Sequence, residues 1–176
     1  GTAVEVPEEE VRRIASYFAP PTFARLPAVS EGFERQQRTD AQFALWARAS
    51  LHPHKQPGYA IVNISLKPIG GVPGDATAEQ MDIIADLAER YAFDEVRVTH
   101  EQNLTLPHVR QDDLYALWQE LDAAGLATAN INTVTDIIAC PGLDYCNLAN
   151  ARAIPIAQKI SERFGDIEQA HDIGEL

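Results

Sequence analysis

The residues with the clearest chemical potential in this sequence are its two cysteines, Cys140 and Cys146, which are separated by five residues. Cysteine thiolates are nucleophiles and ligands for soft metals such as zinc and iron. Zinc centres and iron–sulfur clusters usually take four protein ligands, and the sequence contains no further cysteine. The spacing alone therefore leaves three interpretations open: part of a metal site, two buried free thiols, or a disulfide across a tight turn.

The residues before Cys146 predict a strand followed by a turn. Residues 133–139 are typical of a strand that ends at Cys140. Pro141 and Gly142 suit the centre of a type II turn, because proline presets φ and glycine accepts a positive φ. This geometry would bring the two sulfurs toward one soft metal centre.

A helix is predicted after this turn, with Cys146 in its first turn. Asp144 can cap a helix that begins near Tyr145. The free N–H groups and the positive dipole at this helix end would stabilise a Cys146 thiolate. We expect the helix to run to about Phe164, and Pro155 either to kink it or to start a fresh helix. From residue 167 on, the chain should lead into a strand.

Composition excludes several classes of partner. The 176-residue chain carries 14 basic and 26 acidic residues, which argues against binding to nucleic acid and disfavours anionic membranes. No apolar run approaches the roughly 18 residues that span a bilayer. Two cysteines, and a first stretch without the features of a signal peptide, favour a reducing cytoplasm.

The pattern divides the chain into a helical arm over residues 1–55, a compact α+β unit over 56–127 and the start of a second domain over 128–176. Within the unit, the predicted elements are a strand (59–67), a helix (77–91), two strands that pair as a hairpin (95–99 and 103–109) and a helix (111–124). This β-α-β-β-α order is most of a ferredoxin-like unit, short of one strand.

Three details of this unit are specific enough to check. Alternation over residues 59–67 places Ala60, Val62, Ile64 and Leu66 on the core face, and Lys67 on the opposite face. Pro107 is expected at a sheet edge or a strand end, because it has no N–H to donate. The glycine-rich stretch 68–76 is expected to be a plain connection, because no P-loop Lys-Ser/Thr follows it.

Three stretches resemble the siroheme-dependent sulfite and nitrite reductases, over about residues 50–176. Residues 135–149 are similar to the family's first cysteine pair, C-x5-C. Residues 97–104 are similar to its strand–turn–strand segment T-x-x-Q-N near siroheme. Residues 52–71 are similar to the opening of its second ferredoxin-like half domain.

The resemblance implies a role for each matching residue. Cys140 and Cys146 would be two of the four ligands of a [4Fe–4S] cluster. Thr99, Gln102 and Asn103 would line the siroheme and meet its carboxylates. Residues 128–176 would begin the siroheme and [4Fe–4S] domain of an assimilatory-type sulfite reductase, with nitrite reductase as the alternative.

The family's second cysteine pair, C-x3-C, is absent from this sequence. We therefore expect a fragment of the C-terminal half of such an enzyme, inactive and without cofactors by itself. Its partners would be the remainder of its own polypeptide and an external electron donor, a flavoprotein or a ferredoxin. Two other interpretations stay open: a non-catalytic ferredoxin-like binding module, and a small protein that uses its two thiols as a redox pair.

Overall fold

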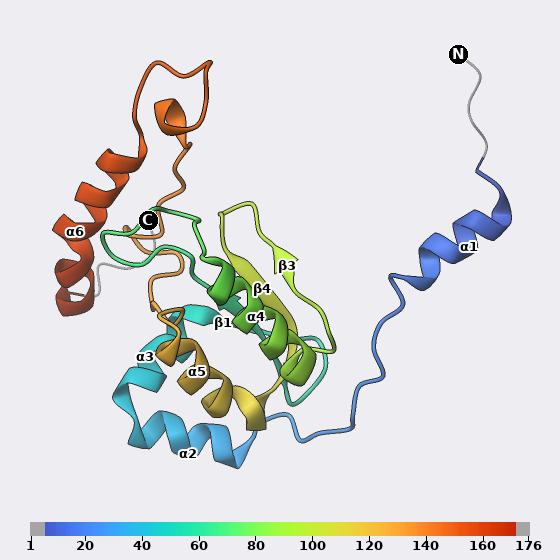
Figure 1. Ribbon diagram of the computed structural model, residues 1–176. Coiled ribbons are helices and arrows are strands. Elements are labelled where there is room, and N and C mark those ends of the chain that lie inside the picture. Colours follow the sequence, from blue (N-terminus) through green and yellow to red (C-terminus); the bar gives the residue numbers. More distant parts are fainter. Residues whose placement is uncertain (1–5, 172–176) are drawn as a thin grey trace.

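The centre of the fold is a four-stranded antiparallel sheet in the order β1-β2-β4-β3 (Figure 1). The computed structural model describes residues 6–171. The strands are β1 (Leu51–Pro53), β2 (Tyr59–Ile64), β3 (Arg97–Val98) and β4 (Leu104–Arg110). This arrangement confirms the α+β class and the ferredoxin-like order. The fourth strand, which the sequence pattern missed, is β1, and it comes from the segment that we assigned to the arm.

The helices are α1 (Glu8–Ser16), α2 (Glu31–Thr39), α3 (Ala41–Ser50), α4 (Ala78–Tyr91), α5 (Leu114–Ala123) and α6 (Ile154–His171), with 3-10 turns η1 (Gln111–Asp113) and η2 (Gly142–Asp144). The start of α4 follows from a capping box, in which Thr77 accepts from the Gln80 N–H and the Gln80 side chain accepts from the Thr77 N–H. In contrast, α1 has no buried residue and stands away from the body on an extended connection (Figure 1).

One hydrophobic core joins the sheet to α3, α4 and α5. The predicted inward residues of β2 are all buried, and they continue into Leu66. Opposite them, Leu106 of β4 is fully buried and pairs with Val62. The helices contribute the buried side chains Phe43, Trp46, Ile84, Leu87, Leu114, Leu117 and Leu121.

Pro107 lies inside the central strand β4, so our expectation of an edge or a strand end was wrong. Ala60 pairs with Val109 and Val62 pairs with Leu106, which leaves Ile61 alone opposite Pro107 and the residue after it. This irregularity is a β-bulge, a place where a strand tolerates a residue without an N–H.

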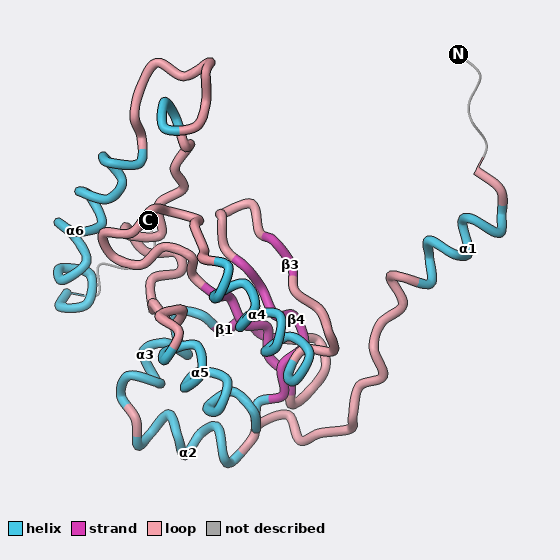
Figure 2. The backbone as a smooth tube through the Cα atoms, in the orientation of Figure 1, coloured by secondary structure: helices cyan, strands magenta, loops and turns pink. Residues whose placement is uncertain are grey.

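Residues 126–153, which we call the cysteine segment, are almost entirely irregular (Figure 2). The predicted strand over 133–139 does not form, and the helix expected near Tyr145 is replaced by the short turn η2. Pro155 lies in the first turn of α6, where its missing N–H has no helical partner to lose, so the alternative of a fresh helix is confirmed. Residues 167–171, where we expected the chain to lead into a strand, continue α6; the rest of that prediction, residues 172–176, lies outside the described part.

Candidate functional site

Both cysteines are free thiols on an irregular loop. Cys140 is exposed and Cys146 is partly exposed. Between them the chain closes on itself, because the Leu143 N–H donates to the Ala151 carbonyl at 3.1 Å and the Cys146 N–H donates to the Gly142 carbonyl at 2.8 Å. We call residues 142–151 the cysteine loop.

Gly142 is the residue on which this loop closes. Its φ is +59°, and a Cβ there would lie 2.5 Å from the Ala151 carbonyl oxygen. Pro141 has a ψ of −24°, so the expected type II turn, which needs an extended ψ at that position, is not formed. The positive φ that we expected of Gly142 is present, and the close approach of Ala151 is a second reason for glycine.

The structure corrects the surroundings of Cys146. The helix α6 begins at Ile154, eight residues later, and Asp144 is the last residue of η2 instead of the cap of a helix. The helix-dipole argument for a Cys146 thiolate therefore does not apply here. What both cysteines share is access to solvent and a defined loop.

The residues Thr99, Gln102 and Asn103 belong to the tight turn between β3 and β4, which we call the T-x-x-Q-N turn (residues 99–103). The Thr99 N–H donates to the Asn103 carbonyl at 2.9 Å, and the Asn103 N–H donates to the Thr99 hydroxyl at 3.2 Å. Gln102 adopts a φ of +58° at the tip. These bonds close the turn from the inside.

Gln102 joins this turn to the first cysteine. Its side-chain Nε2 donates to the Ala139 carbonyl at 3.0 Å, and its Oε1 accepts from the Ala139 N–H at 2.9 Å. Ala139 directly precedes Cys140. The fold thus brings two of the stretches singled out in the sequence, 37 residues apart, into direct contact.

Asn103 is buried and adds further hydrogen bonds where the T-x-x-Q-N turn meets the cysteine segment. Its Oδ1 accepts from the Leu66 N–H and its Nδ2 donates to Asp136, both at 3.1 Å. Asp136 also binds the Lys67 ammonium at 2.6 Å, in an ion pair whose side chains are 2% and 6% exposed. The structure therefore contradicts the sequence pattern, which placed Lys67 on the outer face.

This buried ion pair is the part of the site that sequence reasoning missed. Strand alternation fails at Lys67 because β2 ends at Ile64, so the period of two no longer holds. Asn130 adds to the junction by donating to the Lys67 carbonyl at 3.0 Å. The one signal in the sequence was a charged residue, Asp136, close before a cysteine.

The glycine-rich loop over residues 68–76 contacts α6, the helix that follows the cysteine segment. The Gly70 N–H donates to the Ser161 hydroxyl at 3.0 Å, and the Gln158 side chain donates to the Gly70 carbonyl at 3.1 Å. Both partners lie on α6. The loop therefore connects the α+β unit (residues 56–127) to α6 through these two hydrogen bonds.

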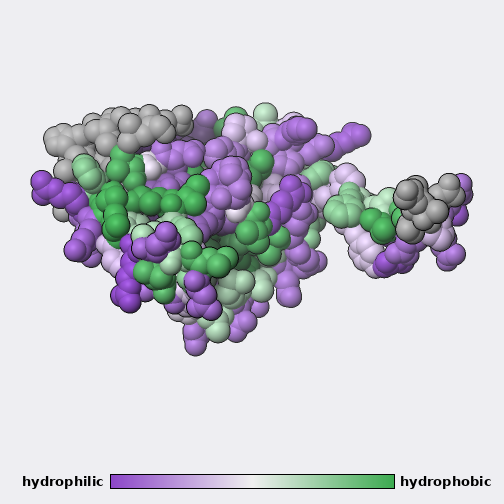
Figure 3. Space-filling model, turned by 90° about the horizontal axis from the view of Figure 1, so that it is seen from above, coloured by the Kyte–Doolittle hydropathy of each residue, from purple (hydrophilic) through white to green (hydrophobic). Residues whose placement is uncertain are grey.

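The face above the cysteine loop is partly apolar. Figure 3, which views the molecule from above Figure 1, shows apolar surface gathered over the body on this side. Large exposed apolar side chains of the cysteine segment are Ile138, Leu143, Tyr145 and Leu148. Leu148, at 94% exposure, has the least protein cover of these.

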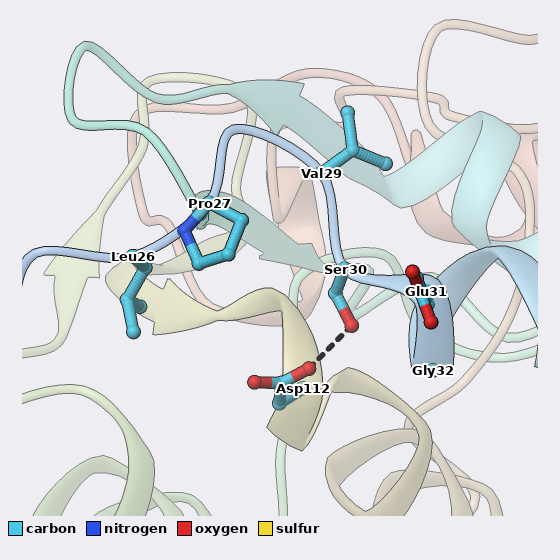
Figure 4. A pocket seen from close by; sticks show the side chains of 8 residues that line it. Leu26, Pro27, Val29, Ser30, Glu31, Gly32 and Asp112 are labelled. Carbon is cyan, nitrogen blue, oxygen red and sulfur yellow. Dashed lines mark hydrogen bonds between the residues drawn. The ribbon is translucent and has the colours of Figure 1, made fainter.

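A separate hollow of about 270 Å³ lies where the chain before α2 meets η1 (Figure 4). Ser30 donates a hydrogen bond to Asp112 at its rim. This hollow is separate from the candidate site, because none of its lining residues belongs to the cysteine segment. Two of the lining side chains, Glu31 and Asp112, are acidic.

Residues 6–171 contain no group of three or more His, Cys, Asp or Glu side chains arranged to hold a metal. The two cysteines can thus supply part of a metal site but not a complete one. Over the same residues, no helix is both long and apolar enough to span a bilayer.

Comparison with known proteins shows that residues 52–124 match a known protein-family model. These residues match the family model "Nitrite/Sulfite reductase ferredoxin-like half domain". The chain is 32% identical to a ferredoxin–nitrite reductase of Zea mays over 139 residues, which are 74% of this chain and 24% of the relative.

Two bacterial relatives extend the comparison. The chain is 33% identical to a ferredoxin–nitrite reductase of Synechococcus elongatus, over 62% of this chain and 21% of the relative. It is 27% identical to sulfite reductase [ferredoxin] 2 of Mycolicibacterium paratuberculosis, over 69% of this chain and 23% of the relative. The matched part is thus about a quarter of the length of these curated relatives.

Proposed function

The chain belongs to the nitrite and sulfite reductase family, and on that premise we propose that it supplies two cluster ligands to a longer reductase. In this proposal Cys140 and Cys146 bind iron of a [4Fe–4S] cluster next to siroheme. When bound, these groups supply the electron transfer for the six-electron reduction of sulfite or nitrite. The observation that carries the proposal is the pairing of Gln102 with Ala139, which links the T-x-x-Q-N turn to the first cysteine.

The state of the two thiols fits a ligand role. Both are free, and neither is enclosed in the core, so an iron ion can reach them. The cysteine loop is closed at Gly142 and Ala151, which limits where Cys146 can lie. Two thiolates fill half of the usual four positions, and we propose that a Cys-x3-Cys pair outside this chain fills the others.

The T-x-x-Q-N turn offers hydrogen-bond donors beside the cysteines. Thr99 uses its hydroxyl oxygen to accept from Asn103, which leaves the hydroxyl proton for a carboxylate of siroheme. Gln102 uses one Nε2 proton on Ala139 and keeps the second. Asn103 is 3% exposed and its amide is bound to Leu66 and Asp136, so its part in this proposal is to hold the turn.

The substrate is an oxyanion of sulfur or nitrogen, and the proposed donor is a ferredoxin. Two of the reported relatives are named as ferredoxin–nitrite reductases and one as a sulfite reductase that uses ferredoxin. Both substrates therefore belong in the same assay, with reduced ferredoxin as the electron source.

The test is spectroscopic and uses the longer reductase that contains this chain, purified without oxygen from cells that make siroheme. The Cys140→Ser and Cys146→Ser variants are each expected to lose cluster absorption and the coupled electron paramagnetic resonance signal. Met81→Leu, which removes an exposed sulfur on α4, is the matched control and should retain both.

Two results would contradict the proposal. One is a colourless wild-type protein without siroheme or cluster absorption, which would favour a ferredoxin-like binding module. The other is an unchanged cluster in both cysteine variants. Within the first result, a reversible Cys140–Cys146 disulfide with a measurable potential would favour a thiol redox protein over a binding module.

A further inference from the structure

Gln102 holds a backbone conformation that does not favour glutamine. Its φ of +58° lies in the left-handed region, which glycine and asparagine enter with less strain. The turn also packs closely there, since a Cβ on Gly74 would lie 2.9 Å from the Gln102 Cβ. Because the backbone gives no reason for a long side chain at this position, the reason lies in what the side chain binds.

Both polar atoms of that side chain bind one peptide residue. The amide nitrogen donates to the Ala139 carbonyl and the amide oxygen accepts from the Ala139 N–H. A carboxamide that binds both backbone groups of one residue fixes that residue in two directions, as a neighbouring strand would. Ala139 is 7% exposed, so water competes little for these bonds.

Cys140 lies between two fixed points although it is itself exposed. Ala139 is held by Gln102 on one side, and on the other side the Leu143 N–H donates to the Ala151 carbonyl. Upstream, the segment is fastened to the half domain by the buried contact between Lys67 and Asp136. The backbone position of Cys140 is therefore set by polar contacts of its neighbours, because the exposed cysteine is not part of the core.

We propose that Gln102 is a positioning residue for Cys140, acting through the Ala139 peptide. The inference rests on the proposed function in one respect, that the positioned sulfur binds iron. Within it, Gln102 couples the T-x-x-Q-N turn to the cluster ligand, so the turn and the sulfur move as one body.

The chain contains a matched control. Gln111 makes a similar pair of backbone contacts elsewhere, but to two residues: its Oε1 accepts from the Ser30 N–H at 2.9 Å and its Nε2 donates to the Ala28 carbonyl at 3.2 Å. That contact fastens the chain before α2, at the end of the body opposite the cysteine loop in Figure 1. Gln111→Met therefore removes the same chemistry without touching Cys140.

The experiment uses the 176-residue chain without iron and measures amide hydrogen exchange by NMR. Gln102→Met keeps the length of the side chain and removes both hydrogen bonds. We expect the protection factor of the Ala139 amide to fall about 5–30-fold, the equivalent of one or two net hydrogen bonds. Gln111→Met should leave Ala139 unchanged and lower the protection of the Ser30 amide.

A spectroscopic readout follows the sulfur itself. In a Cys146→Ser background, Cys140 is the single thiol, and a nitroxide attached to it reports local motion. Gln102→Met should raise the mobility of this label, and Gln111→Met should not. Equal Ala139 protection and equal label mobility in wild type and Gln102→Met would overturn the proposal.

A third variant, Gln102→Glu, gives a pH profile that a general loss of stability would not produce. The carboxylate can accept from the Ala139 N–H but repels the Ala139 carbonyl, whereas the protonated acid can again donate to it. The protection factor at Ala139 should therefore rise as pH falls through the carboxyl pKa, ordinarily about 4.3. A flat profile contradicts the inference. Because no iron is present, these results are independent of whether the longer protein assembles a cluster.

Discussion

The half domain and the cysteine segment lie against each other but are fixed in different ways. In the half domain, the sheet and three helices share one apolar core, with Val62 and Leu106 fully buried at its centre. The cysteine segment has almost no regular structure, and much of its anchoring comes from side chains of the half domain, chiefly Lys67, Asn103 and Gln102. Its apolar side chains divide into two groups: Leu126 and Ile131 are buried, whereas those around the cysteines, such as Leu148, are exposed.

The difference shows what each kind of contact can do. Apolar burial is roughly proportional to area and has little direction, so it stabilises a compact unit without fixing single atoms. Hydrogen bonds and ion pairs are directional, and a few of them can hold an irregular chain in one place. Around the two solvent-accessible cysteines the chain has little apolar burial, so directional contacts are the main means by which it is fixed there.

The largest effect is expected at the buried ion pair. Asp136→Ala leaves the Lys67 ammonium buried without its partner, and we expect a loss of about 3–5 kcal/mol in the free energy of unfolding, measured by urea denaturation. The double change Lys67→Met with Asp136→Leu should restore part of it, because no charge is then buried although the Asn103 amide loses its acceptor. Glu120→Ala, which breaks an exposed pair with Arg90, should cost about 1 kcal/mol or less. Equal losses at Asp136 and Glu120 would remove the distinction between the two regions.

Leucines in the two regions should differ next. Leu106→Ala opens a cavity in the core and should cost about 2–5 kcal/mol in urea denaturation. Leu148→Ala makes the same chemical change at a side chain that is 94% exposed, and should change stability by no more than about 0.5 kcal/mol. A large effect of Leu148→Ala would show that the cysteine loop has an apolar anchor after all.

Alanine substitutions at Gly125 and Gly142 distinguish two contributions to the loss of stability: a strained backbone conformation, and a steric clash of the added Cβ. Gly125, at the end of α5, has a φ of +69° and open space around it, so Gly125→Ala should cost about 1–2 kcal/mol. Gly142→Ala pays the same backbone cost and meets the Ala151 carbonyl, which should add about 1–3 kcal/mol. Hydrogen exchange of the Leu143 amide, which is bound to Ala151, shows whether the loss is local to the cysteine loop. Equal costs at the two glycines would mean that the loop opens without resistance.

The smallest effect is a pH dependence in the half domain. His108 accepts or donates a hydrogen bond with His54, and its Nε2 lies 3.4 Å from Glu95. Burial lowers the pKa of His108 below its ordinary value near 6.5; His54 and Arg97 lower it further, while Glu95 opposes the shift. The folded state therefore binds fewer protons than the unfolded state, so this contribution is complete above about pH 6.5 and is lost as pH falls through the lower folded pKa.

The measurement is urea denaturation between pH 5 and 8. His108→Gln should flatten the dependence of the unfolding free energy on pH, whereas His52→Gln, a change at an exposed histidine, should leave it unchanged. Glu95→Gln removes the opposing carboxylate and should steepen the profile. A profile that His108→Gln does not alter would assign the pH dependence to other groups.

Most of the half domain could be predicted from periodicity, and most of the cysteine segment could not. The inward side chains of β2 and the helices over 77–91 and 111–124 follow from local patterns, and the structure confirms them. The strand over 133–139 was wrong, because Asp136 and Ala139 bind side chains far away in the sequence instead of a neighbouring strand. The helix near Tyr145 was also wrong, because the chain there closes into the local turn η2. Whether Thr99, Gln102, Asn103 and the two cysteines bind cofactors stays a prediction.

The sequence by itself showed the resemblance to the family, predicted the order of elements in the half domain and singled out the two cysteines as candidate ligands. Only the tertiary structure decided that Lys67 is buried against Asp136, that β1 completes the sheet and that Gln102 binds the residue before Cys140. The physical reason is the separation in sequence between the residues that are in contact. Helix and strand patterns record contacts between near neighbours in the chain, whereas a buried ion pair or a side-chain clamp depends on residues that only folding brings together.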